Sequence, residues 1–216
     1  MKLFKEILFT LFAIAFVTLV PQSGIVPLPF GYSIPVLLFI WLFLKKNKEN
    51  FINLGFSFKR FKKEAFLVGA TIGILLFLFL QYAFFPILNN IITIKPANLN
   101  DFASIKYNTP QFIFVLVMGW LVGGFYEEIV FHGFIFSRLE KIITGKYALA
   151  ISFLITNLIF AFYHWQLGVS GAINAFLAGV VYHALMLLHK RNMWYAIFCH
   201  AVFDTIALTL LYEGYM

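Results

Sequence analysis

Seven apolar runs, separated by short polar breaks, follow one another along the 216 residues of the chain. A helix needs about 20 apolar residues to cross the hydrocarbon core of a bilayer, and most of the runs approach that length. Inside lipid the backbone must satisfy its own hydrogen bonds, which a helix does. The pattern therefore predicts an all-α, polytopic membrane helical bundle with about seven transmembrane helices. The predicted spans are 7–20, 29–44, 65–88, 110–137, 147–164, 170–188 and 192–212.

The composition indicates that the main solvent is lipid. Hydrophobic residues make up 62% of the chain and charged residues 12%, and the mean hydropathy is +0.90. A water-soluble domain carries about 25% charged residues. The lipid bilayer is therefore the first expected partner, and no soluble domain is expected. The first run is expected to be a retained span, because residues 21–24 do not form the small-residue cleavage site of a signal peptide.

The basic residues gather in alternate polar breaks. If the N-terminus is cytoplasmic, the inner segments hold 14 of the 16 Lys and Arg residues, and only Lys95 and Lys106 lie outside. This bias follows the positive-inside rule and predicts an integral membrane protein with a cytoplasmic N-terminus. We expect the membrane to be a prokaryotic plasma membrane. The charges are dispersed over loops, so no nucleic-acid partner is expected. The basic, Phe-rich segment 51–63 either lies flat on the inner leaflet or forms an ordinary charged loop.

Acidic and imidazole side chains inside the predicted spans are the candidates for chemistry. An Asp costs about 2.5–3.5 kcal/mol at the centre of a membrane helix, so such groups persist mainly where they serve a function. Glu127 and Glu128 are adjacent in an apolar run. In a low dielectric the two carboxylates cannot both ionise cheaply, so one of them is suited to accept a proton from water near neutral pH, as a general base does. On a helix Glu128 shares a face with His132, whereas Glu127 points about 100° away. We assign Glu127 to the chemistry and Glu128 to a polar network with His132.

Later spans supply further imidazoles and one more carboxylate. His200 and Asp204 are four residues apart, so they project from one stripe of the last span. This arrangement suits fixing an imidazole tautomer, holding a water molecule or binding a metal. His164 closes the fifth run and shares a helical face with Phe160. We interpret His183, in the sixth span, as a packed or hydrogen-bonded side chain.

In chain order these residues form the patterns Glu127-Glu128-x-x-x-His132, Phe160-x-x-x-His164 and His200-x-x-x-Asp204. The set resembles the CPBP family of intramembrane peptidases, which includes the type II CAAX prenyl endopeptidases and the bacteriocin-processing or immunity proteins called Abi. The family pattern is Glu-Glu-x-x-x-Arg, then Phe-x-x-x-His, then His-x-x-x-Asn or Asp. The resemblance divides the chain into N-terminal transmembrane helices with a basic loop (1–109), a peptidase-like region (110–207) and a C-terminal end (208–216).

The resemblance implies an intramembrane endopeptidase that hydrolyses a peptide bond in a membrane-associated or lipidated peptide or protein. Glu127 and His164 are then expected to activate the attacking water. His200 and Asp204 are expected to hold that water or to stabilise the oxyanion of the tetrahedral intermediate. Glu128 is expected to support the site.

Two points of chemistry stay open on the sequence. His132 stands where the family has Arg, and an imidazole lacks the permanent charge and the five donors of a guanidinium. With His132 in the place of this Arg, the enzymatic activity is therefore expected to depend on pH or to be lost. Glu127, His164, His200 and Asp204 are also chemically able to bind zinc, so a zinc cofactor and metal-free catalysis are both compatible with the motifs.

Three other interpretations compete with the peptidase. Residues 168–171 match the Gly-x-Ser-Gly nucleophile pattern of rhomboid proteases, with His183 or His200 as the base, but this leaves both glutamates idle. A non-catalytic CPBP-like membrane protein, serving in bacteriocin immunity or as a scaffold, would have lost turnover through His132. An unrelated transporter would use a glutamate as a proton relay. The substrate and the oligomeric state do not follow from the sequence.

Overall fold

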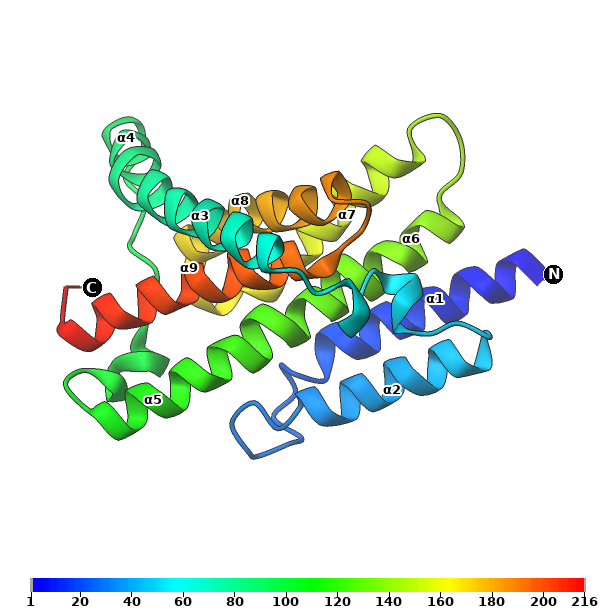
Figure 1. The fold of residues 1–216 in the computed structure, drawn as a ribbon, viewed down its shortest axis with the longest axis horizontal. Helices are drawn as coiled ribbons and strands as arrows, with labels where there is room; N and C mark the ends of the chain where they lie inside the picture. The colour runs from blue at the N-terminus through cyan, green and yellow to red at the C-terminus, as the bar shows by residue number, and fades with distance from the viewer. Residues whose placement is uncertain (1, 216) are drawn as a thin grey trace.

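The computed structural model describes residues 2–215, which form helices joined by turns and loops, with no strand among them (Figure 1). The all-α fold class is therefore confirmed, and each predicted span coincides with a helix. The first part of the chain forms α1 (Lys2–Leu19), α2 (Ser33–Lys46), η1 (Phe51–Leu54), η2 (Phe58–Arg60), α3 (Lys63–Phe79), η3 (Leu80–Phe84) and α4 (Phe85–Ile91). The rest forms η4 (Asn100–Ile105), α5 (Thr109–Met118), η5 (Gly119–Ile135), α6 (Phe136–Ile142), α7 (Ala148–Tyr163), η6 (Trp165–Leu167), α8 (Gly168–Leu188) and α9 (Met193–Glu213).

Within residues 2–215, 4 helices are long and apolar enough to cross a membrane, namely Lys63–Ile91, Thr109–Ile142, Trp165–Leu188 and Met193–Glu213. The first two run without a break through the π-helical stretches η3 and η5. The remaining apolar runs form the shorter helices α1, α2 and α7. Length and composition therefore support these 4 crossings. The expected total of about seven crossings is compatible with the fold.

The last helix, α9, packs closely against α3 and η5, and glycines make this approach possible. A Cβ atom on Gly69 would lie 2.8 Å from the carbonyl oxygen of Tyr195, and one on Gly73 would lie 2.5 Å from that of Cys199. The two glycines are four residues apart on α3, a spacing that lets membrane helices bring their backbones together. On η5, a Cβ on Gly124 would lie 2.8 Å from the methyl group of Ala201. These contacts fix α9, which carries two of the predicted site residues, within the bundle.

The basic loops meet at one end of the bundle. The Glu49 carboxylate, in the loop after α2, pairs with Arg138 and Lys141 of α6. Partial burial acts to raise the pKa of Glu49, but hydrogen bonds from the two cations outweigh it and hold that pKa below its usual range. Arg191, in the turn between α8 and α9, donates two hydrogen bonds of 2.7 Å to Glu140. The loops that the charge pattern assigns to one side therefore lie together, while the direction in which they face stays a prediction.

Backbone contacts join the loops at the opposite end. The N–H of Asn98 donates to the carbonyl of Leu167 at 2.9 Å, and the N–H of Tyr107 donates to the carbonyl of Tyr212 at 3.0 Å. The segment around η4 is thereby tied to η6 and to the end of α9. In Figure 1 the N-terminus and the C-terminus lie on opposite sides of the molecule.

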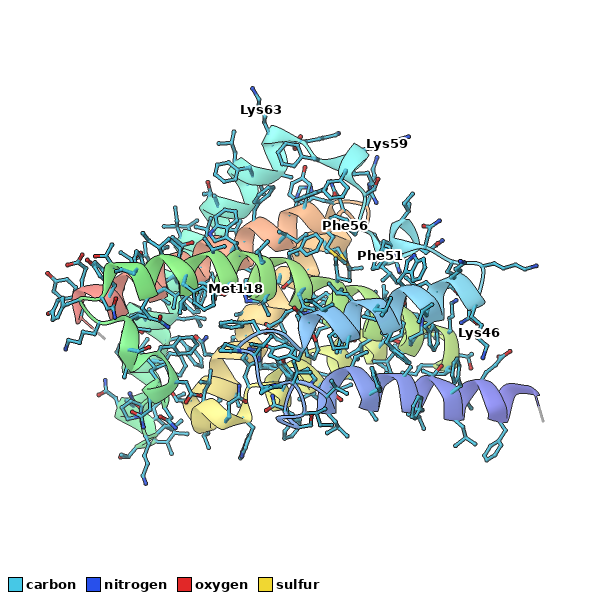
Figure 2. The ribbon with its side chains drawn as sticks, turned by 90° about the horizontal axis from the view of Figure 1, so that it is seen from below. Lys46, Phe51, Phe56, Lys59, Lys63 and Met118 are labelled. Carbon is cyan, nitrogen blue, oxygen red and sulfur yellow. The ribbon has the colours of Figure 1, made fainter. Side chains whose placement is uncertain are left out.

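The basic segment 51–63 forms the short 3-10 turns η1 and η2 and an extended link to α3. Its Phe56 is buried, with ring centroids 5.4 Å from Trp194 and 5.0 Å from Phe125. Figure 2 shows Lys59 and Lys63 at the outer edge of the molecule, whereas Phe56 lies towards the helices. The segment is therefore anchored by an aromatic side chain and presents its lysines outwards.

Candidate functional site

The predicted site residues come from three elements. Glu127, Glu128 and His132 lie on η5, His164 directly follows the end of α7, and His200 and Asp204 lie on α9. Because η5 is π-helical, it is wider than an α-helix, and such segments are frequent at functional sites. The structure brings all six side chains into one connected group, which the following contacts describe.

Glu128 joins two of the histidines. Its side chain is fully buried, and its two oxygens lie 2.7 Å from Nδ1 of His132 and 2.9 Å from Nδ1 of His200. An ionised carboxylate can only accept hydrogen bonds, so both Nδ1 atoms are the donors. Each ring therefore turns its Nε2 away from Glu128. The Glu128–His132 contact follows from their i, i+4 spacing, whereas the contact with His200 joins η5 to α9.

Glu127 faces the other two imidazole nitrogens. Its Oε2 lies 3.6 Å from Nε2 of His164 and 4.0 Å from Nε2 of His200, and Asp204 Oδ2 lies 3.5 Å from the same His200 nitrogen. These separations are longer than direct hydrogen bonds, and polar groups at such distances are commonly bridged by water. Nδ1 of His164 donates to the carbonyl of Phe160 at 2.9 Å, which leaves its Nε2 as an acceptor in the neutral ring. The four side chains thus surround a space suited to one water molecule.

Aromatic packing holds the two imidazoles in place. The ring of Tyr182, on α8, stacks on His200 with centroids 4.5 Å apart and an interplanar angle of 18°. Phe160 meets His164 edge-on at 4.6 Å and His200 at 6.1 Å. Phe160 therefore links both rings, which explains physically why a Phe precedes His164 by one helical turn.

A glycine makes room for the Asp204 carboxylate. A Cβ atom on Gly123 would lie 2.5 Å from Asp204 Oδ2 and 3.7 Å from Nε2 of His200. Any larger residue at position 123 would displace one of these groups. Gly123 lies four residues before Glu127, so the same face of η5 that carries the catalytic candidate also leaves space beside it.

The group opens onto a cavity of ≈ 240 Å³ whose walls include Glu127, His164, His200 and Asp204. The other walls are mainly apolar and come from η4, α5, η5, α7, η6, α8, α9 and the segment just before α2. Asn174 of α8 adds one neutral amide to the lining. A mostly apolar cavity with a few convergent polar groups is the usual form of a binding site for an organic ligand.

Two sequence-based alternatives fit this geometry less well. Among residues 2–215, no three His, Cys, Asp or Glu side chains are arranged so that they could hold one metal ion. The donor set proposed for zinc therefore does not fit as it stands, and no catalytic step is assigned to a metal. Ser170, the nucleophile of the rhomboid-like pattern, is absent from the walls of this cavity, and His183 is fully buried away from it.

Sequence reasoning missed Tyr182, Asn174 and Gly123. A lone tyrosine or asparagine in an apolar run carries no mark of its role, because its partner comes from another helix. Gly123 had a usable signal, since two consecutive glycines precede the glutamate pair by one turn. Small residues at that spacing indicate close approach of another backbone or side chain.

The fold and this site define a class of protein: a polytopic helical membrane protein in which buried carboxylates and imidazoles converge on an internal cavity. Comparison with known proteins gives a family match over a little under half of the chain. Residues 109–206 match the family described as "Type II CAAX prenyl endopeptidase Rce1-like". This match confirms the family resemblance drawn from the three motifs, over the region that contains all of them. No curated protein and no solved structure matches the chain.

Proposed function

We propose that this protein is an intramembrane endopeptidase that hydrolyses a peptide bond in a membrane-associated or lipidated peptide. The observation that carries the proposal is the position of Glu127 Oε2, 3.6 Å from Nε2 of His164 and 4.0 Å from Nε2 of His200 on the wall of the cavity. A carboxylate and two imidazoles at these distances can hold one water between them. The family match supports protease chemistry in general.

The proposed reaction begins with a water molecule held by Glu127 and His164. Glu127 takes a proton from the water while the water oxygen bonds to the carbonyl carbon of the substrate. The carbonyl oxygen becomes an oxyanion, which Nε2–H of a protonated His200 stabilises, with Asp204 orienting that ring. The C–N bond then breaks, and the proton held by Glu127 passes to the leaving amine. Glu128 keeps His200 in place through Nδ1.

The cavity supports an apolar substrate. Phe102, Met118 and Phe203 are among its walls, and the elements that form it lie mostly in helices long enough to cross a membrane. Apolar groups gain about 25 cal/mol per Å² of surface that leaves water. A lipid chain or apolar side chains next to the scissile bond would therefore bind here more readily than a charged peptide.

Peptide cleavage by the purified protein in liposomes tests the proposal. Glu127→Gln removes the general base without changing its size, and His164→Gln keeps a polar side chain but removes the imidazole. Each is expected to lower kcat by about 10²–10⁴-fold, the usual contribution of a general base. Glu213→Gln, at an exposed position on α9, is the matched control and is expected to cleave like the wild type. Unchanged cleavage by the Glu127→Gln protein would refute the proposal.

A second candidate is a non-catalytic membrane protein of the same fold. The observation in its favour is His132, which pairs with Glu128 where the family has Arg. Such a protein would bind the peptide without cleaving it. Binding measured by fluorescence anisotropy in the same liposomes separates the two functions, because an enzyme releases product whereas a scaffold retains the intact peptide.

A further inference from the structure

Behind the candidate site lies a second group of buried polar side chains that the proposed reaction does not use. It consists of His132 on η5, Asn157 on α7 and His183 on α8, each with none of its surface exposed. Asn157 Nδ2 lies 3.2 Å from Nδ1 of His183, and the rings of His183 and His132 have centroids 4.8 Å apart. His132 in turn contacts Glu128, so the group continues into the site.

The contacts of Asn157 determine which nitrogen of His183 carries the proton. Asn157 Nδ2 donates to the carbonyl of Phe153 at 2.8 Å, which fixes the orientation of the amide. The second N–H of the same NH₂ group points to Nδ1 of His183. That nitrogen therefore accepts, and the neutral ring holds its proton on Nε2. His183 is thus a donor at the nitrogen that faces away from Asn157.

His132 has the opposite arrangement. Its Nδ1 donates to Glu128 at 2.7 Å, so Nε2 of the neutral ring is an acceptor. Among the described residues, neither Nε2 of His132 nor Nε2 of His183 has a hydrogen-bond partner, although both atoms are buried. A buried donor or acceptor left unpaired destabilises the folded protein. A donor and an acceptor on neighbouring rings, both unpaired, are complementary to one water molecule.

We propose that a buried water bridges Nε2–H of His183 and Nε2 of His132. It completes a directional chain in which Asn157 donates to His183, His183 to the water, the water to His132, and His132 to Glu128. Buried waters typically make about three hydrogen bonds, and this water has a remaining proton for a further acceptor. The hydroxyls of Ser152 and Thr156 on α7 are also buried without a partner. This region therefore contains more buried polar groups than the hydrogen-bond partners within the protein satisfy.

This chain of hydrogen bonds makes His183 and Asn157 positioning residues, a role that rests on the proposed function. Glu128 accepts from both His132 and His200, so the tautomer of His132 influences how the carboxylate holds His200. Neutral His132 offers Glu128 a single donor, whereas an arginine would offer several. With the water fixing its proton on Nδ1, His132 donates to Glu128 continuously. The water and His183 thus compensate locally for the missing guanidinium.

Solid-state ¹⁵N NMR of the full-length protein in liposomes tests the chain directly. The sequence has 5 histidines, so ring signals can be assigned by single substitutions. The expected result is a protonated Nε2 on His183, a protonated Nδ1 on His132, and magnetisation transfer from water to both rings. A protonated Nδ1 on neutral His183, or no transfer from water to either ring, would overturn the proposal.

Two variants of His183 connect the chain with turnover. His183→Phe keeps an aromatic ring against Phe136 and Phe153, which pack on it at 4.3 and 4.4 Å, but removes the donor. It is expected to abolish the water signal at His132 and to lower kcat about tenfold with KM unchanged. A loss of this size is typical when a residue that orients a functional imidazole is removed. His183→Gln retains an N–H donor and is expected to restore most of kcat. Equal kcat in the Phe variant and the wild type would contradict the positioning role.

Asn157→Leu gives a second test if the His183→Phe protein does not fold. Loss of the amide is expected to release His183 from its Nε2–H tautomer, seen as a mixture of ring forms in the ¹⁵N spectrum. An unchanged tautomer would contradict the chain. If the wild-type protein cleaves no peptide, the proposed function fails, but the NMR measurements on wild type and variants still decide whether the bridged chain exists.

Discussion

The Glu128 carboxylate accepts a hydrogen bond of 2.9 Å from Nδ1 of His200, a residue 72 positions further along the chain. The same carboxylate accepts from His132 at 2.7 Å, and its side chain is fully buried. It therefore joins η5 to α9 at the point where the candidate site is assembled. Both oxygens are occupied by donors, so the carboxylate cannot be replaced by an amide without creating a conflict.

Glu128→Gln tests this bridge. The glutamine has one carbonyl oxygen and one NH₂ group, so one imidazole Nδ1–H would face a donor. An unsatisfied buried polar group costs about 1–3 kcal/mol, and the variant is expected to unfold at a lower temperature in detergent. Cleavage is expected to fall because His200 loses its anchor. Glu213→Gln, exposed on α9, provides the matched control. A variant with wild-type stability and turnover would show that the bridge has no energetic role.

His132→Arg tests whether the family's arginine fits this protein. The His132 ring is fully buried, with centroids 5.3 Å from Phe160 and 4.8 Å from His183. A longer side chain is expected to overpack this space and to destabilise the protein by about 1–3 kcal/mol. Removing the neighbouring ring in the double variant His132→Arg/His183→Ala is expected to recover part of the loss, so the two changes are non-additive. Thermal unfolding of the four proteins of this cycle measures the coupling, and strict additivity would contradict it.

The sequence was sufficient to predict features that depend on the spacing of residues along a single helix. Lipid requires long apolar helices, so each predicted span coincides with a helix, and the i, i+4 spacing anticipated the contact of Glu128 with His132. The contact of Glu128 with His200 could not be predicted, because it depends on how two helices pack. The π-helical form of η5 was also hidden, since its apolar pattern does not distinguish i→i+5 from i→i+4 hydrogen bonding.

The buried group on α7 shows a signal that was present but not used. Ser152, Thr156 and Asn157 are polar positions in an otherwise apolar run, and their spacing of four and five residues places them on one side of a helix. In a membrane helix such a polar face is expected to point into the bundle. Their association with His183 required the structure, because that residue lies on the next helix.

Gly73→Ala tests the close packing of α3 on α9. The added methyl group would lie 2.5 Å from the carbonyl oxygen of Cys199, and backbone cannot move aside as a flexible side chain can. The helices must separate, so a loss of about 1–3 kcal/mol of stability is expected. Gly119→Ala is the matched control, because its new methyl group would meet only the end of Leu208 at 3.3 Å. Thermal unfolding in detergent measures both, and equal stability of the two variants would contradict the packing argument.

Single cysteines test the predicted orientation of the chain. The native Cys199 is fully buried and is expected to remain unlabelled. Lys59→Cys and Lys146→Cys lie in the basic loops, and Lys95→Cys lies in the segment assigned to the other side; all three positions are exposed. With a cytoplasmic N-terminus, a membrane-impermeant maleimide is expected to label only Lys95→Cys in intact cells and the other two in inverted vesicles. Labelling of Lys59→Cys and Lys146→Cys from opposite sides would contradict the predicted topology.

Glu49 gives a prediction for the dependence of stability on pH. Partial burial favours its protonated form, but hydrogen bonds and charge from Arg138 and Lys141 outweigh this and lower its folded-state pKa below the ordinary value of 4.5. A carboxyl with a depressed pKa stabilises the fold fully above its unfolded pKa, and this contribution is lost as the pH falls through the folded pKa. The wild type is therefore expected to unfold at a higher temperature than Glu49→Gln at pH 7, and this difference is expected to shrink below about pH 4.5. Unfolding temperatures of both proteins between neutral and acidic pH measure it, and the exposed Glu213→Gln variant controls for the general effect of acid. A difference that stays constant with pH would mean that Glu49 acts through packing, because charge pairing with the two cations disappears once the carboxyl is protonated.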